Sequence, residues 1–64
     1  MTSREIIRKL KSDGWQHVAT VGDHCQFKHP VKPGRVTVPH PEKDIEIELI
    51  KSIEKQGGLK LRNS

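Results

Sequence analysis

The sequence predicts a small α+β domain of the order α-β-β-β-α, with a three-stranded antiparallel sheet and two helices on one of its faces. Three observations support this prediction. Apolar residues repeat at helical spacing near both ends of the chain. The segment between them consists of short β-prone runs interrupted by glycine and proline. The chain has 64 residues, which is enough for one domain with a thin core.

The first helix is predicted over about residues 3–13. Thr2 and Glu5 stand three residues apart, as in a capping box, and Gly14 is a natural stop at the other end. The apolar stripe of this helix is Ile6, Ile7 and Leu10. The helix is therefore expected to bury one face and to leave a basic face in solvent.

Three strands are predicted between the helices, over residues 15–21, 25–29 and 35–38. Gly22 and Asp23 supply the turn between the first two strands, and the proline-rich segment 30–34 is a loop. In the first strand we expect His17 and Ala19 to lie on the same face, with Val18 on the other.

Alternation assigns the faces of the second and third strands. The residues expected to face the helices are Cys25, Phe27, Val36 and Val38. The residues expected on the open face are His24, Gln26 and Lys28, opposite Arg35 and Thr37. An error of one residue in the register would exchange the two faces.

The second helix is predicted over about residues 45–56, with Asp44 as its N-cap. Its apolar stripe is Leu49, Ile50 and Ile53. Gly57 and Gly58 end it, and Leu59 is expected to fold back onto its last turn. The folded domain is then expected to cover residues 1–60, followed by a flexible tail at 61–64.

The formal charge of +4 favours a polyanionic partner but does not by itself choose between RNA, DNA and a membrane surface. A histidine beside the basic residues of so small a chain favours RNA. With a single cysteine no intrachain disulfide can form, which suits a reducing cytoplasm. No apolar run is long enough to predict a membrane span. The two aromatic residues argue against RNA binding through several base-stacking platforms.

His24 is the candidate catalytic residue, because it follows the glycine turn and precedes a basic strand. An imidazole that titrates near neutrality can take a proton from a ribose 2′-hydroxyl, while nearby cations stabilise the phosphate. The candidate phosphate contacts are Lys28, Lys32 and Arg35. The simpler alternatives are a histidine that merely follows a turn and cations that form a solvated sheet edge.

The other histidines are expected to be structural. His29 and His40 each precede a proline, where the backbone is restricted, although His29 is the nearest candidate for a second acid–base group. His17 is expected to be packed or half-exposed. Cys25 and His29 give only two metal ligands, so we predict neither a metal site nor a cofactor.

Several spaced motifs resemble the HicA family of toxins, also called YcfA-like mRNA interferases. These motifs are Asp13-Gly14-Trp15, Gly22-x-His24-x-x-Phe27-Lys28-His29-Pro30, Val36-Thr37-Val38-Pro39-His40-Pro41 and Ile53-x-Lys55-Gln56-x-Gly58-Leu59. The resemblance implies a fold like that of the double-stranded-RNA-binding domain. It also implies a ribonuclease that cleaves mRNA and is neutralised by a HicB-type antitoxin.

The same resemblance places the family's catalytic histidine on His24 and the preceding glycine on Gly22, which we expect to lie at the RNA. Asp23 and Cys25 depart from the usual family pattern, in which Ser or Thr precedes the histidine and a second histidine often follows it. Asp23 could hydrogen-bond His24 or repel the phosphate. Two other functions remain open: a non-catalytic RNA-binding module, and an adaptor that docks a protein on its open sheet face.

Overall fold

The computed structural model describes residues 1–62 and has the predicted order α-β-β-β-α. The elements are α1 (Ser3–Ser12), β1 (Gln16–Val21), β2 (His24–Lys28), β3 (Arg35–Pro39) and α2 (Ile47–Gly57). The strands form one antiparallel sheet of order β1-β2-β3. Within the described chain, neither helix has the length and apolar character needed to cross a bilayer.

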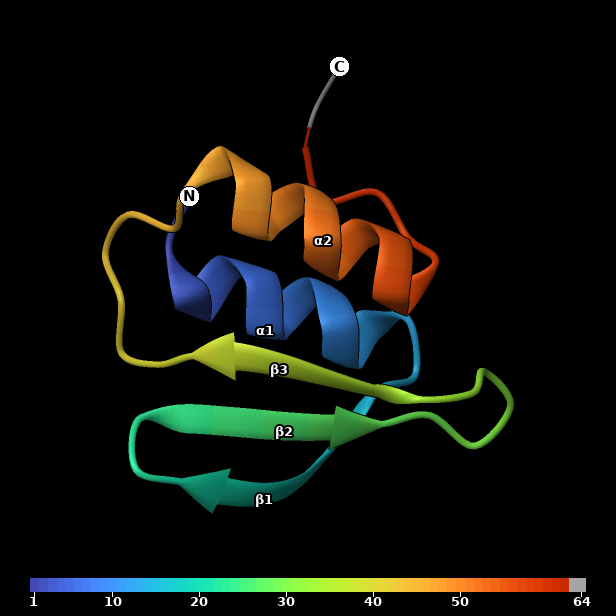
Figure 1. The fold of residues 1–64 in the computed structure, drawn as a ribbon. Coiled ribbons are helices and arrows are strands. Elements are labelled where there is room, and N and C mark those ends of the chain that lie inside the picture. Colours follow the sequence, from blue (N-terminus) through green and yellow to red (C-terminus); the bar gives the residue numbers. More distant parts are fainter. Residues whose placement is uncertain (63–64) are drawn as a thin grey trace.

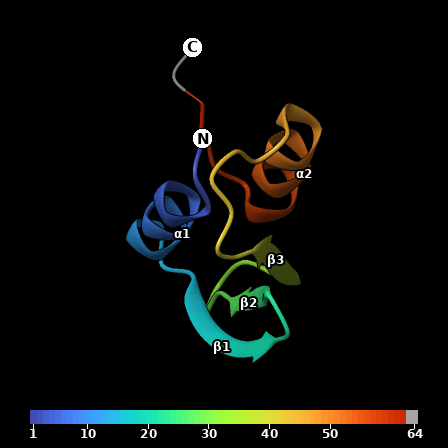
Figure 2. The same cartoon turned by 90° about the vertical axis from the view of Figure 1, so that its left-hand side faces the viewer.

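Both helices lie on one face of the sheet and run in the same direction across it (Figure 1). Viewed from the side, α1 lies over the β1 edge and α2 over the β3 edge (Figure 2). The core fills the space between the two layers and is built around Trp15, Phe27 and Val36 together with the apolar stripes of the helices. The opposite face of the sheet is not covered by any described element, so the fold class is as predicted.

The first helix begins with the predicted capping box. The Thr2 hydroxyl accepts from the backbone N–H of Glu5, and the Glu5 carboxylate accepts in return from the backbone N–H of Thr2. The last turn of α1 contains Lys9 and Lys11, which suits the negative end of the helix dipole.

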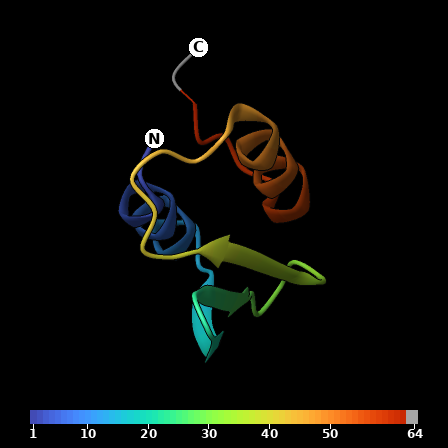
Figure 3. The ribbon, with the colours of Figure 1, turned by 60° about the vertical axis from the view of Figure 1, so that its left-hand side comes forward.

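The predicted start of the second helix is wrong by two residues. Its N-cap is Glu46, and Asp44 instead lies 3.7 Å from the amino group of Met1. Ile45 is buried, and its backbone N–H donates to the carbonyl of Met1, so this segment is extended against the start of α1. Figure 3 shows the segment running from β3 past the N-terminus of α1 to α2.

The end of α2 agrees with the prediction. Gly58 has a positive φ of 61°, and the N–H of Leu59 donates to the carbonyl of Glu54, as in a Schellman motif. A Cβ on Gly57 would lie 2.5 Å from the Leu59 side chain. The glycine therefore lets the chain fold back onto the last turn.

The flexible tail predicted at 61–64 is wrong for the first two residues. Leu61 is buried in the core, and its carbonyl accepts from the Lys9 ammonium. The Arg62 side chain forms an ion pair with Glu54 at 2.9 Å. Leu61 adds a large apolar group to a small core, which the sequence pattern did not reveal. Residues 63–64 lie outside the described part of the chain.

The register of β2 against β3 confirms the predicted faces. Gln26 pairs with Thr37 and Lys28 with Arg35, all on the open face. The four residues predicted to face the helices, Cys25, Phe27, Val36 and Val38, are all buried.

The faces predicted for β1 are wrong beyond His17, because the strand contains an irregularity. His17 pairs with Phe27, and Ala19, two residues later, pairs with Gln26, so the register shifts between them. One extra residue, Val18, is accommodated as a β-bulge. His17 therefore lies on the helix face and Ala19 on the open face, although the sequence alternation placed them together.

Candidate functional site

His24 is the first residue of β2 and lies on the open face of the sheet. Its side chain is 58% exposed. The neighbouring residues Cys25 and Phe27 point to the opposite face and are buried in the core, so packing fixes the strand beneath the imidazole. A large ligand such as a polynucleotide can therefore reach the ring.

The turn before His24 is a two-residue hairpin formed by Gly22 and Asp23. Gly22 has a φ of 61°, and no described residue other than glycine has a positive φ, which is the pattern of a type II′ turn. A Cβ on Gly22 would meet nothing within 4 Å, so glycine is needed here for its backbone conformation alone. The backbone N–H of His40 donates to the carbonyl of Asp23 at 2.6 Å and anchors the turn to the end of β3.

Asp23 does not hydrogen-bond His24. The carboxylate oxygen Oδ1 lies 3.7 Å from Nε2, which is beyond hydrogen-bond length, and both side chains are largely exposed. An exposed pair of this kind contributes little to stability or orientation. The Asp23–His24 hydrogen bond considered from the sequence is thus not formed.

The open face next to His24 contains a bonded polar pair. Arg35 donates from Nη1 to the Gln26 Oε1 atom at 2.7 Å. Gln26 is two residues from His24 on the same face, so it directs the guanidinium toward the middle of the sheet. Lys28 pairs with Arg35 at the far end of β2, about 13 Å along the strand from His24.

Lys32 is not part of this face, although the sequence grouped it with Lys28 and Arg35. Its ammonium is paired with the Asp13 carboxylate and donates to the carbonyls of Gly57 and Gly58 at 3.0 Å each. This hydrogen bonding and charge hold the pKa of the Asp13 carboxyl below its usual value. Lys32 therefore joins the loop after β2 to the ends of both helices.

His29 has no free ring nitrogen for catalysis. Its Nδ1 accepts from the backbone N–H groups of Val31 and Lys32, each at 3.0 Å. A nitrogen that accepts in this way carries no proton, so the Nε2–H group donates to the Asp13 carbonyl at 2.8 Å. The ring also packs edge-on against Trp15. The structural role predicted for His29 is supported, and both nitrogens are occupied.

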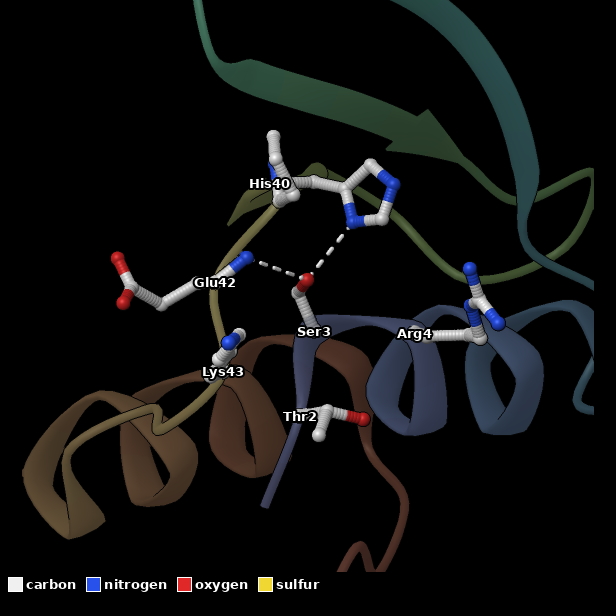
Figure 4. A pocket seen from close by; sticks show the side chains of 7 residues that line it. Thr2, Ser3, Arg4, His40, Glu42 and Lys43 are labelled. Carbon is white, nitrogen blue, oxygen red and sulfur yellow. Dashed lines mark hydrogen bonds between the residues drawn. The ribbon is translucent and has the colours of Figure 1, made fainter.

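A Ser–His pair lies beside an open pocket of about 240 Å³ at the start of α1 (Figure 4). The Ser3 hydroxyl is 2.7 Å from Nδ1 of His40, a distance that also occurs in activated serine nucleophiles. However, Ser3 is only 2% exposed, and its oxygen already accepts from the backbone N–H of Glu42 at 2.9 Å. The pair is a structural connection between α1 and the segment after β3.

The described residues, 1–62, contain no group of three or more His, Cys, Asp or Glu side chains able to hold a metal ion. Cys25 is buried in the core and His29 is bonded to Asp13, so the pair considered from the sequence does not form a site.

Two features of this region were not foreseen from the sequence. Gln26 was placed on the open face by alternation, but its bond to Arg35 depends on side-chain conformations that the pattern does not encode. Ser3 and His40 are 37 positions apart, and neither has a local signal that points to the other.

Together these features define a small basic α+β domain whose uncovered sheet presents an accessible imidazole at one end of β2 and two cationic side chains at the other. A sequence model of the family described as "HicA toxin of bacterial toxin-antitoxin" matches residues 3–59. The chain therefore belongs to the HicA toxin family.

A solved structure supports this assignment. The chain is similar to one from a structure entitled "HicA3 and HicB3 toxin-antitoxin complex", with 33% sequence identity and a TM-score of 0.83. The match covers 97% of this chain and 100% of that chain. A comparison with curated proteins returned no match.

Proposed function

We propose that this HicA toxin is an endoribonuclease that cleaves mRNA in the cytoplasm without a metal or cofactor, and that His24 is its catalytic residue. The observation that supports the proposal most directly is the position of His24. Its imidazole is 58% exposed on the sheet face that neither helix covers, with Arg35 and Lys28 further along the same face.

The reaction needs only a proton acceptor and positive charge. Neutral His24 takes the proton of a ribose 2′-hydroxyl, and the oxygen attacks the adjacent phosphorus. The bond from phosphorus to the 5′-oxygen breaks, and the imidazolium returns the proton to that oxygen. The products are a 2′,3′-cyclic phosphate and a 5′-hydroxyl end. Arg35, which Gln26 holds in place, can stabilise the charge on the phosphoryl oxygens.

The proposed RNA-contacting residues are Lys28, Arg35 and Gly22. Lys28 and Arg35 are exposed and adjacent across β2 and β3, so they can contact successive phosphates. Gly22 would contact RNA through the exposed backbone of the turn that precedes His24. Lys32 is left out of this set, since three protein acceptors already surround its ammonium.

The proposed partner is a HicB-type antitoxin, by analogy with the similar chain, whose structure is entitled a complex of HicA3 with HicB3. An antitoxin that covers the open face would exclude RNA from His24. Acidic groups on it would complement Lys28 and Arg35.

The decisive experiment compares the wild type with His24→Ala and His24→Gln. We expect at least a 10²-fold loss of RNA cleavage in both variants, because the proton acceptor is removed. Circular dichroism and thermal unfolding should be unchanged, since the side chain is exposed. The wild-type reaction should continue in the presence of a chelator and give 2′,3′-cyclic phosphate ends, which can be detected by mass spectrometry.

Growth after controlled expression provides the second readout, with arrest expected for the wild type only. Wild-type rates in either His24 variant would exclude the catalytic role. If neither the wild type nor the variants cut RNA but all bind it with equal affinity, the protein is a non-catalytic RNA-binding module.

A further inference from the structure

A second pocket, of about 200 Å³, lies on the helix face of the sheet and has no part in the function proposed above. It is lined by Ile7, Lys11, His17, Cys25, Phe27 and His40. One wall is apolar, and the rest consists of two imidazoles and one ammonium group. None of the lining residues is acidic.

The β-bulge at Val18 creates one side of this pocket. In a regular strand, residues three apart point to opposite faces, but the extra residue puts both His17 and Thr20 on the helix face. The Thr20 hydroxyl lies 3.8 Å from Cys25 Sγ and 2.7 Å from His17 Nε2. Because the hydroxyl donates to the sulfur, its oxygen accepts from the Nε2–H group of His17, which leaves Nδ1 as an acceptor.

Ser3 fixes the same tautomer in the second imidazole, His40, but occupies the other ring nitrogen. Its oxygen accepts from the Glu42 N–H, and the one described acceptor for its own proton is Nδ1 of His40. The neutral His40 ring therefore carries its proton on Nε2. The His40 ring lines both this pocket and the one at the start of α1. The pocket thus combines a donor from His40 with an acceptor from His17.

An apolar wall, a hydrogen-bond donor and acceptor, and a nearby cation are the features that recognise an unpaired nucleotide. We propose that this pocket binds one nucleotide of the RNA. Its base lies against Ile7, above the buried Phe27, its edge hydrogen-bonds His17 and His40, and its phosphate contacts Lys11. This inference rests on the proposed function, because it takes RNA to be the partner of the protein.

The pocket and the proposed catalytic residue, His24, lie on opposite faces of the same strand, β2. Cys25 lines the pocket and directly follows His24, which points to the other face of the same strand. An RNA strand that reaches both sites passes around the β1 edge or the β1–β2 turn. Holding a nucleotide in the pocket would then fix which phosphate lies at His24 and so influence the choice of cleaved bond.

The test uses ¹⁵N-labelled His24→Ala protein, which should not cut RNA, titrated with the four ribonucleoside monophosphates and with a short single-stranded RNA. We expect shifts in the amide signals of Ile7 and Lys11, which line the pocket but lie on α1, away from position 24. In the same background, His17→Ala and Lys11→Ala should each weaken RNA binding about tenfold. The matched controls are Gln16→Ala and Arg8→Ala, which are exposed neighbours that do not line the pocket.

The outcomes separate this inference from the proposed function. If wild-type protein cuts RNA while the pocket amides stay unchanged and His17→Ala binds like Gln16→Ala, the pocket inference is overturned and the ribonuclease proposal stands. Shifts with a mononucleotide but not with RNA would assign the pocket to a free nucleotide and overturn the RNA assignment. Pocket shifts with RNA, together with no cleavage by wild type, would support the pocket and contradict the ribonuclease proposal.

Discussion

Gly14 and His29 show how closely single residues are constrained next to the core. Gly14 has a φ of 103°, and a Cβ at this position would lie 2.7 Å from Nε2 of His29. That nitrogen donates to the carbonyl of Asp13, so the ring cannot move without losing the bond. Two independent requirements therefore favour glycine at this position.

We expect Gly14→Ala to lower the free energy of unfolding by about 2–4 kcal/mol, from backbone strain and displacement of His29. Gly34→Ala is the matched control, because Gly34 also has a positive φ, of 82°, but has open space around its Cβ position. The control should cost only about 1–2 kcal/mol. Urea unfolding measures both, and equal losses would show that contact with His29 adds nothing.

At the level of single residues, the sequence predicted the candidate site well where strand alternation determines it. His24, Lys28 and Arg35 lie on the expected face because β2 and β3 pair without irregularity. Lys32, which the sequence grouped with these cations, lies off this face, and its partners Asp13 and Gly57 are 19 and 25 positions away in the chain. Loop residues take their conformation from such distant contacts, and no local pattern encodes them.

Among the secondary-structure elements, the helices depend on contacts made by residues outside them. Lys32 donates to the last carbonyls of α2 and pairs with the residue that follows α1. Cationic groups at helix C-termini stabilise the helix through its dipole and its unpaired carbonyls. The same cation was expected from the sequence to contact RNA.

Lys32→Ala should therefore affect mainly stability, and Lys28→Ala mainly RNA affinity. We expect Lys32→Ala to lower the free energy of unfolding by about 1–3 kcal/mol, with RNA affinity nearly unchanged for the folded protein. Lys28→Ala should weaken RNA binding and leave stability within about 0.5 kcal/mol of the wild type. Thermal unfolding and fluorescence anisotropy with labelled RNA measure the two quantities. A loss of RNA affinity in folded Lys32→Ala would restore the interpretation made from the sequence.

Glu54 connects α2 to the end of the described chain and makes stability depend on pH. The Arg62 side chain and the backbone N–H groups of Leu61 and Arg62 lower the pKa of Glu54 from 4.5 to about 2. Because the folded-state pKa is the lower one, this contribution is fully present above pH 4.5. It is lost as pH falls from 4.5 toward 2.

We expect Glu54→Gln to be less stable than the wild type at neutral pH, and the difference to shrink as pH falls through this range. The matched control is Glu48→Gln, on the same helix, since Glu48 makes no ion pair among the described residues. Urea unfolding at a series of pH values measures the difference. A difference that stayed constant with pH would assign the role of Glu54 to packing instead of charge.

The start of α2 was misplaced from the sequence for a related reason. Asp44 is a good N-cap by type, but Ile45 is drawn into the core, and its N–H bonds to Met1. Burial of an apolar side chain outweighs the weak local preference for capping. The helix therefore begins only after Ile45 has been placed in the core.

For the molecule as a whole, the two layers leave one face of the sheet uncovered. The helices and the core occupy one side, so Lys28 and Arg35 remain on the other, in a protein of net charge +4. The overall order of elements could be predicted because both helices and all three strands carry clear local signals. The burial of Leu61 could not, because a single leucine in a polar segment carries no periodicity.

Charge reversal on this face should affect RNA and antitoxin together. We expect Lys28→Glu and Arg35→Glu each to weaken RNA binding and to reduce the slope of log affinity against log salt by about one. Binding of a HicB-type antitoxin should weaken in the same variants. Lys51→Glu, an exposed reversal on α2, is the control. If only one partner were affected, the two would use separate surfaces.

The bulge at Val18 also determines how sequences of this type should be compared. It shifts the phase of the side-chain alternation, so odd-numbered positions of β1 face the helices before Val18 and even-numbered positions do so after it. Substitutions on the two sides of the bulge therefore obey opposite rules for polarity. Deleting Val18 would restore a regular ladder in which His17 still opposes Phe27 and Ala19 still opposes Gln26. An alignment that counts residues without the bulge would therefore assign every position on one side of Val18 to the wrong face of the sheet.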